Sequence, residues 1–170
     1  MYLGLPAPDP PVQPRDARPG LYRSVRDHST IKVENTNAAL SVDGRPVPSA
    51  ARFVNDKMFL RNPVYGEDVW ERVDQFIPAD LSAFAGIYAS DEAETVLRVE
   101  LENGNLVIHR RPDASFKLEP TYAGAFESPL GSVHFLRDTS GKIVALSLAG
   151  SRVWDLRFTR QNAETPAALH

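Results

Sequence analysis

The sequence predicts an all-β protein whose antiparallel strands follow one another as a meander. Three observations support this prediction. Apolar and polar residues alternate over most of the middle of the chain, short turn sequences separate the alternating segments, and only one short segment carries helical signals. The chain has 170 residues, of which 42% are hydrophobic, so it has room for one domain or for two small repeats around a shared core.

The clearest strand pair lies in the second half of the chain. Every second residue from Thr95 to Leu101 is expected on one, mainly apolar, face of a strand, and the return strand covers residues 106–109. Asn103-Gly104 between them is a strong hairpin signal, because a type I′ turn needs two successive residues with positive φ. Three further strands are expected at 133–137, 143–148 and 152–160. In the last of these strands, Trp154 is expected to lie on the buried face.

The two ends of the chain and one internal segment do not follow the strand pattern. Residues 1–19 contain six of the fourteen prolines, which fix φ and remove backbone donors, so we expect an extended arm there. Residues 161–170 lack periodic apolar positions and are expected to form a tail. Asp80 can cap a short helix over Leu81–Ala85, which we expect to act as a plug or lid at a barrel end.

An internal repeat organises the segment between the two ends. Gly20-Leu21-Tyr22 recurs as Gly86-Ile87-Tyr88, and a similar strand begins nine residues after each tyrosine. The first copy lacks about eight residues near its end, which corresponds to one strand and its turn. Because an absent strand leaves an unpaired sheet edge, we expect the first copy to complete its sheet against the second copy or against another protein.

We therefore expect four parts along the chain. Their ranges are 1–19 for the proline-rich arm, 20–77 for the shorter β repeat, 78–160 for the longer β repeat and 161–170 for the tail.

Three pieces of the longer repeat are similar to a known family. They are F-A-G-x-Y-x-S-D-E at 84–92, E-N-G-N-L at 102–106 and R-V-W-D-L-R-F at 152–158. In this order and spacing they resemble the C-terminal lipocalin-like β-barrel region of bacterial serine hydrolases of the penicillin-binding protein and class C β-lactamase superfamily. The shorter repeat looks like the preceding barrel module of members that have two modules. The resemblance implies a lipocalin-like barrel preceded by a shortened repeat of the same type.

The catalytic domain of these hydrolases is separate and longer than this chain. Its signature includes S-x-x-K with the serine at the start of a buried helix. Ser29-Thr30-Ile31-Lys32 matches the letters, but the surrounding alternation predicts a strand, which would point Ser29 and Lys32 to opposite faces. We therefore expect a chance match and a non-catalytic accessory module that works with a β-lactamase-like serine hydrolase. The alternative is a lipocalin-like binder of a small apolar ligand.

Two groups of residues are candidates for a ligand or interaction site. Tyr88 and Trp154 recur at matched positions of the repeat, where they would pack the core or line a ligand cavity. The second group is a basic cluster on or near the hairpin, and it consists of Arg98, His109, Arg110 and Arg111. This cluster could hold a carboxylate or an acidic rim of a partner, or it could be surface charge balanced by Glu100 and Glu102.

Several classes of function do not fit the composition. The net charge of −3 and the pI near 5.8, without a basic tract, argue against nucleic-acid binding. The chain has no cysteine, and its four histidines have no metal-ligand spacing, so neither a metal nor a cofactor is expected. No apolar run approaches the roughly 20 residues of a membrane span. The first residues lack the features of a signal peptide, which favours the cytoplasm, whereas the hydrolases of the resembled family are usually exported; localisation stays open.

Overall fold

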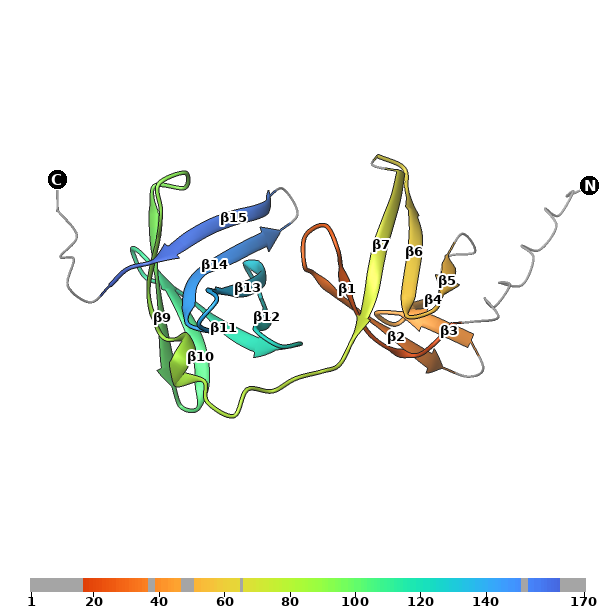
Figure 1. The fold of residues 1–170 in the computed structure, drawn as a ribbon, viewed down its shortest axis with the longest axis horizontal. Helices are drawn as coiled ribbons and strands as arrows, with labels where there is room; N and C mark the ends of the chain where they lie inside the picture. The colour runs from red at the N-terminus through yellow and green to blue at the C-terminus, as the bar shows by residue number, and fades with distance from the viewer. Residues whose placement is uncertain (1–16, 37–38, 47–50, 65, 151–152, 163–170) are drawn as a thin grey trace, which may run out of the picture. The chain divides into compact units, whose positions relative to one another are not determined.

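A computed structural model describes residues 17–36, 39–46, 51–64, 66–150 and 153–162. This part of the chain consists of strands with one short 3-10 helix (Figure 1). The strands form two separate antiparallel sheets, which confirms the predicted all-β meander. Among the described residues, one compact unit holds 17–25 and 31–73, and the other holds 26–30 and the chain from Asp74 onward.

The second unit is a closed barrel of eight strands. Its strands pair in the order β10-β11-β12-β13-β14-β15-β8-β9, so β8 and β15 close the ring. The elements are η1 (Ser82–Phe84), β8 (Gly86–Ser90), β9 (Thr95–Glu102), β10 (Asn105–Arg110), β11 (Ala114–Pro120), β12 (Ala125–Ser128), β13 (Gly131–Arg137), β14 (Ile143–Gly150) and β15 (Val153–Arg160).

The hairpin of β9 and β10 forms as the sequence predicts. Asn103 has φ 48° and Gly104 has φ 77°, the two positive values that a type I′ turn needs. The register pairs Val99 with Ile108, and both side chains are buried. The strands expected at 133–137, 143–148 and 152–160 are present as β13, β14 and β15. Two strands, β11 and β12, were not predicted; β11 ends at Pro120 and β12 has only four residues.

Large side chains fill the interior of the barrel. Phe84 from η1 packs edge-on against Phe126 and Phe135, with ring centroids 5.2 and 5.0 Å apart, and Tyr88 lies 5.7 Å from Phe135 in the same manner. The buried cluster comprises Phe84, Tyr88, Leu97, Val99, Leu106, Ile108, Leu118, Phe126, Val133, Phe135, Ile143, Leu146 and Phe158. The interior is therefore a packed hydrophobic core.

Arg160 stabilises the seam where β15 meets β8. The register there pairs Thr159 with Ala89 and Arg160 with Tyr88, so the ladder is short. The Arg160 guanidinium adds hydrogen bonds to the carbonyl oxygens of Ala85 (2.6 Å), Ile143 (3.3 Å) and Ala83 (3.4 Å). These charge-assisted bonds join η1, the residue between η1 and β8, and the start of β14 to the last strand of the barrel.

Gly86 and Tyr88 shape the space that Arg160 occupies. A Cβ atom at Gly86 would lie 2.9 Å from Arg160 Nε, so a larger residue there would force the Arg160 side chain to shift. The Arg160 guanidinium lies 5.9 Å from the centroid of the Tyr88 ring, and the Tyr88 hydroxyl donates to the Phe84 carbonyl oxygen at 2.8 Å. The G-x-Y sequence is therefore part of the barrel closure.

The first unit is a seven-stranded sheet in the order β4-β3-β2-β1-β7-β6-β5. Its strands are β1 (Gly20–Ser24), β2 (Thr30–Thr36), β3 (Ala39–Val42), β4 (Arg45–Pro46), β5 (Arg52–Val54), β6 (Lys57–Asn62) and β7 (Gly66–Val73). No ladder joins the outer strands β4 and β5 among the described residues, so this sheet is open where the barrel is closed. The first sheet has seven strands against eight, as expected, but the expected position of the missing strand near the end of the copy is wrong. Strand β6 pairs with β7 as β14 pairs with β15, so the counterpart of β14 is present and the difference lies earlier in the copy.

The first unit repeats the arginine–glycine–tyrosine arrangement. Arg72 on β7 pairs with Tyr22 on β1, and a Cβ atom at Gly20 would lie 2.8 Å from Arg72 Nε. The Tyr22 hydroxyl donates to the Arg18 carbonyl oxygen at 2.8 Å, as Tyr88 does to Phe84. The two tyrosines that reveal the repeat in the sequence therefore occupy equivalent positions in the two sheets.

Two local expectations require correction. The expected helix over Leu81–Ala85 is a single 3-10 turn over Ser82–Phe84, because Asp80 Oδ1 accepts hydrogen bonds from the Ser82 backbone N–H (2.8 Å) and hydroxyl (2.6 Å) and Ala85 is already extended. Trp154 is 43% exposed, because it lies near the start of β15 beside an irregular register with β14. The arm and the tail fall mainly outside the described residues.

We predict that Arg160→Ala destabilises the barrel by about 2 kcal/mol, because three carbonyl oxygens lose a charged donor at a partly buried seam. Urea unfolding of the full chain measures this loss. Arg157→Ala on the same strand is the control, since its ion pair with Asp155 is exposed, and we expect less than about 0.5 kcal/mol for it. Equal losses in the two variants would contradict this account of the seam.

Candidate functional site

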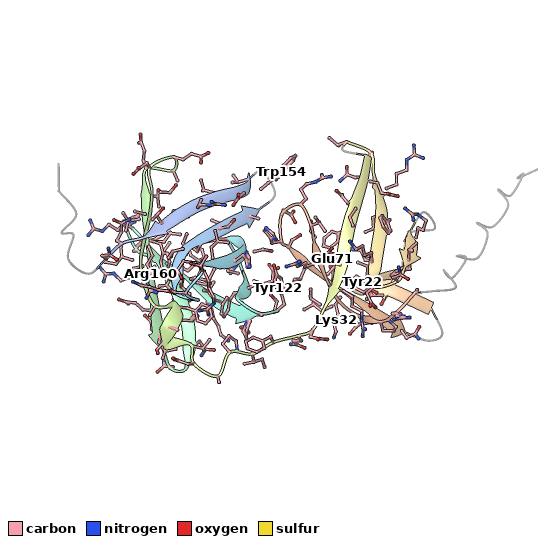
Figure 2. All side chains as sticks on the ribbon, viewed as in Figure 1. Tyr22, Lys32, Glu71, Tyr122, Trp154 and Arg160 are labelled. Atoms are coloured by element: carbon pink, nitrogen blue, oxygen red, sulfur yellow. The ribbon has the colours of Figure 1, made fainter. Side chains whose placement is uncertain are left out.

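The structure separates the two aromatic candidates. Tyr88 is completely buried in the barrel core and has no surface to offer a ligand. Trp154 is partly exposed and lies at the other end of β15 from Arg160 (Figure 2). The two side chains therefore do not line a common cavity.

The basic cluster is divided between the two faces of β10. His109 lies on the outer face opposite Arg98 of β9. Arg110, the next residue, points to the other face at the end of the barrel, where its guanidinium carbon lies 5.8 Å from the Phe116 ring centroid. Arg111 follows the strand and is exposed. Only Arg98 and His109 among the four residues share a site.

Carboxylates surround Arg98 and His109 on the outer face. His109 Nε2 lies 2.7 Å from Glu102 Oε1 and 3.6 Å from Glu100 Oε2, and Arg98 Nη1 lies 3.6 Å from Glu100 Oε1. The sequence had left open whether these cations bind an external carboxylate or are balanced by Glu100 and Glu102. In the structure the two glutamates occupy the positions that an external carboxylate would take.

A shallow cleft of about 660 Å³ lies outside the barrel, beside η1. Its apolar lining includes Phe76, Phe84 and Leu136, and its polar groups are Asp80, His134 and Arg137. Arg137 Nη1 donates to the Gly141 carbonyl oxygen at 2.6 Å. The hydrogen bonds from the Ser82 hydroxyl and backbone N–H lower the pKa of the Asp80 carboxyl. Asp80 is therefore a carboxylate whose Oδ1 atom stabilises the turn.

No pattern in the sequence predicts this cleft. Its walls come from four separate segments, namely the chain before η1, η1 itself, the turn before β12 and β13, and no motif links them. The only signal in the sequence was the exposed apolar pair Phe76-Ile77 immediately before the expected helix.

The outer strand β5 of the first unit has one edge that pairs with no strand among the described residues; we call it the β5 edge and define it as Arg52–Val54. Its other side pairs with β6 through Phe53 and Met58, both buried. Val54 on this edge is 43% exposed. The opposite outer strand β4 contains Pro46, which has no backbone N–H, so the β5 edge is the better hydrogen-bonding template.

The S-x-x-K letters do not form a catalytic arrangement. Ser29 precedes β2, and its hydroxyl donates to Asp27 Oδ1 at 2.6 Å. Lys32 is on β2, where its Nζ pairs with Glu34 Oε1 at 2.5 Å. Ser29 does not begin a helix, as the serine of the hydrolase motif must.

Comparisons with known proteins add no identification. A scan against protein-family models finds no matching family, and a search of curated proteins finds no significant match. Among the described residues, no helix is long and apolar enough to cross a membrane.

Burial makes Tyr88 a pH-dependent element of the core. Desolvation raises its pKa to about 12, so the folded protein binds the phenolic proton more tightly than the unfolded chain does. We predict that this part of the stability is present below pH 10 and is lost as the pH rises from 10 to 12, by roughly 2 to 3 kcal/mol. Urea unfolding over this pH range should show a shallower decline for Tyr88→Phe; identical declines would contradict the prediction.

Proposed function

We propose that this protein is a non-catalytic interaction module that binds its partner through the β5 edge. The observation that carries the proposal is the difference between the two sheets of one chain. The barrel has eight strands and closes on itself, whereas the first sheet has seven strands, whose outer strands have no ladder between them in the described residues. An extended segment of a partner can add to such an edge with backbone hydrogen bonds.

The partner class in this proposal is the catalytic domain of a β-lactamase-like serine hydrolase. Its support is the resemblance of the three pieces at 84–92, 102–106 and 152–158 to the barrel regions of those enzymes. The position of Ser29 and Lys32 also favours a non-catalytic role, since the pair lacks the helical geometry of the hydrolase nucleophile.

A binder of a small apolar ligand is the second candidate. Carrier barrels hold their ligand in the barrel interior, but here buried side chains fill the interior. Such a ligand would therefore bind in the cleft beside η1. The cleft has mainly apolar walls, and its polar groups are the carboxylate of Asp80, the imidazole of His134 and the guanidinium of Arg137, which would suit a small, mainly apolar molecule.

The test of the interaction proposal is capture from the source organism with the full chain as bait. Captured proteins are labelled with a fluorescent β-lactam and a fluorescent fluorophosphonate, which mark serine hydrolases covalently. We expect a labelled protein in the capture with the natural chain and at least a tenfold loss with Val54→Asp, which places a charge on the β5 edge.

The matched control is Val64→Asp, because Val64 is 73% exposed in the same unit and lies outside β5. It should capture as much labelled hydrolase as the natural chain. Capture without any labelled hydrolase would contradict the partner class. Equal loss with both aspartate variants would contradict the β5 edge as the binding site.

We further predict that the purified chain hydrolyses neither a chromogenic cephalosporin nor a p-nitrophenyl ester above the buffer rate, and that Ser29→Ala changes nothing. The reason is that the Ser29 hydroxyl donates a hydrogen bond to Asp27, whereas Lys32 forms an ion pair with Glu34. Spectrophotometric assays of the two proteins measure this directly. Turnover that disappears with Ser29→Ala would overturn the non-catalytic proposal.

A displacement titration with a fluorescent fatty acid tests the second candidate. Saturable binding that Phe76→Ala weakens would favour the cleft as a ligand site, because Phe76 lines the cleft from a partly exposed position. A signal that does not change would exclude this candidate.

A further inference from the structure

We infer that Glu100, Glu102 and His109 on the outer face of the barrel form a binding site for a divalent transition-metal ion such as Zn²⁺. Each residue offers one ligand atom, and the three atoms lie within 4.8 Å of one another. An imidazole nitrogen with two carboxylates is a ligand set suited to Zn²⁺ and less suited to Mg²⁺ or Ca²⁺, which prefer oxygen atoms only. This inference is independent of the proposed partner.

The distances between the ligand atoms are close to those of a metal centre. Tetrahedral bonds of about 2.0–2.1 Å require neighbouring ligand atoms to be about 3.3 Å apart. His109 Nε2 lies 2.7 Å from Glu102 Oε1 and 3.6 Å from Glu100 Oε2, so the two observed distances bracket the required value. Small rotations of exposed glutamate side chains would complete the geometry.

The electrostatics of the cluster also favour a cation at this point. Both carboxylates approach the same nitrogen, His109 Nε2, which can carry only one proton and so can donate to only one of them at a time. A divalent ion bound to Nε2 would instead contact both carboxylates and neutralise their mutual repulsion. The side chains are 45%, 45% and 35% exposed, so water can fill the remaining coordination position.

The backbone holds the site in a fixed place. Glu100 and Glu102 both lie on β9, two positions apart, so they share the outer face, and His109 lies on the neighbouring strand β10. The two strands are joined by the Asn103-Gly104 turn and pair from that turn to Leu97 opposite Arg110. The spacing of the histidines in the sequence does not reveal this site, because its ligand set combines one histidine with two glutamates on the other strand of a hairpin.

Arg98 competes with the metal for Glu100. Its Nη1 lies 3.6 Å from Glu100 Oε1, on the opposite oxygen from the one that faces His109. A guanidinium beside a metal site lowers the affinity for a cation by repulsion and by holding one ligand. Removing this charge should therefore tighten metal binding at this site. Nonspecific binding of the ion to carboxylates elsewhere on the surface would not respond to this single substitution.

The test is isothermal titration of Zn²⁺ into the tag-free full chain, in a buffer that does not bind zinc. We expect one ion per chain, at least tenfold weaker binding for His109→Ala and for Glu102→Gln, and at least threefold tighter binding for Arg98→Ala. Glu119→Gln is the matched control, because this exposed carboxylate pairs with Lys117 on β11, and the variant should bind like the natural chain.

A second measurement locates the ion. The Nε2 resonance of His109 in an imidazole ¹⁵N spectrum should shift on addition of Zn²⁺ and stay unchanged on addition of Mg²⁺. No binding of one ion per chain, unchanged affinity in His109→Ala, or a shift confined to other histidines would each overturn the inference. Unchanged or weaker binding in Arg98→Ala would contradict the proposed competition and the placement at Glu100.

Discussion

Closing an eight-stranded barrel requires the first and last strands to pair, and here that pairing depends on Arg160 crossing Gly86. The ladder between β8 and β15 is short, and the Arg160 guanidinium adds hydrogen bonds across it to the carbonyl oxygens of Ala83 and Ala85, just before β8, and a third to Ile143 of β14. The same side chain lies beside the ring of Tyr88, which connects the seam to the aromatic core around Phe135. The closed ring, in turn, gives the outer face of β9 and β10 its fixed geometry.

The first unit has the same pairing of its first and last strands as the barrel, but one strand fewer. Arg72, Gly20 and Tyr22 repeat the arrangement, so β1 and β7 pair as β8 and β15 do. With seven strands the outer pair β4 and β5 has no ladder between its members in the part that the structure describes. The chain thus combines a closed barrel with an open sheet. The proposed interaction function rests on this difference between the two sheets.

Much of the fold follows from the sequence because strand alternation and turn chemistry are local. The alternation at 95–101 and the Asn103-Gly104 turn are sufficient to predict β9 and β10. The exposure of a side chain at a strand end and the contacts between side chains of neighbouring strands were not predicted, because they depend on the folded barrel. Trp154 was expected in the core but lies at an irregular strand end. The Asn103-Gly104 turn sets the register of β9 and β10, but the approach of the Glu100, Glu102 and His109 side chains across the outer face matches no ligand motif in the sequence.

The central claim is that one sheet closes on itself and the other keeps an open edge. Residue-by-residue amide hydrogen exchange on the full chain, followed by NMR, tests this claim most directly. The account predicts that ladder amides of β8 and β15 exchange only through global unfolding, whereas amides of β5 that do not bond to β6 exchange orders of magnitude faster. Slow exchange of all β5 amides, equal to that of β8, would mean that the first sheet is also closed and would contradict the account.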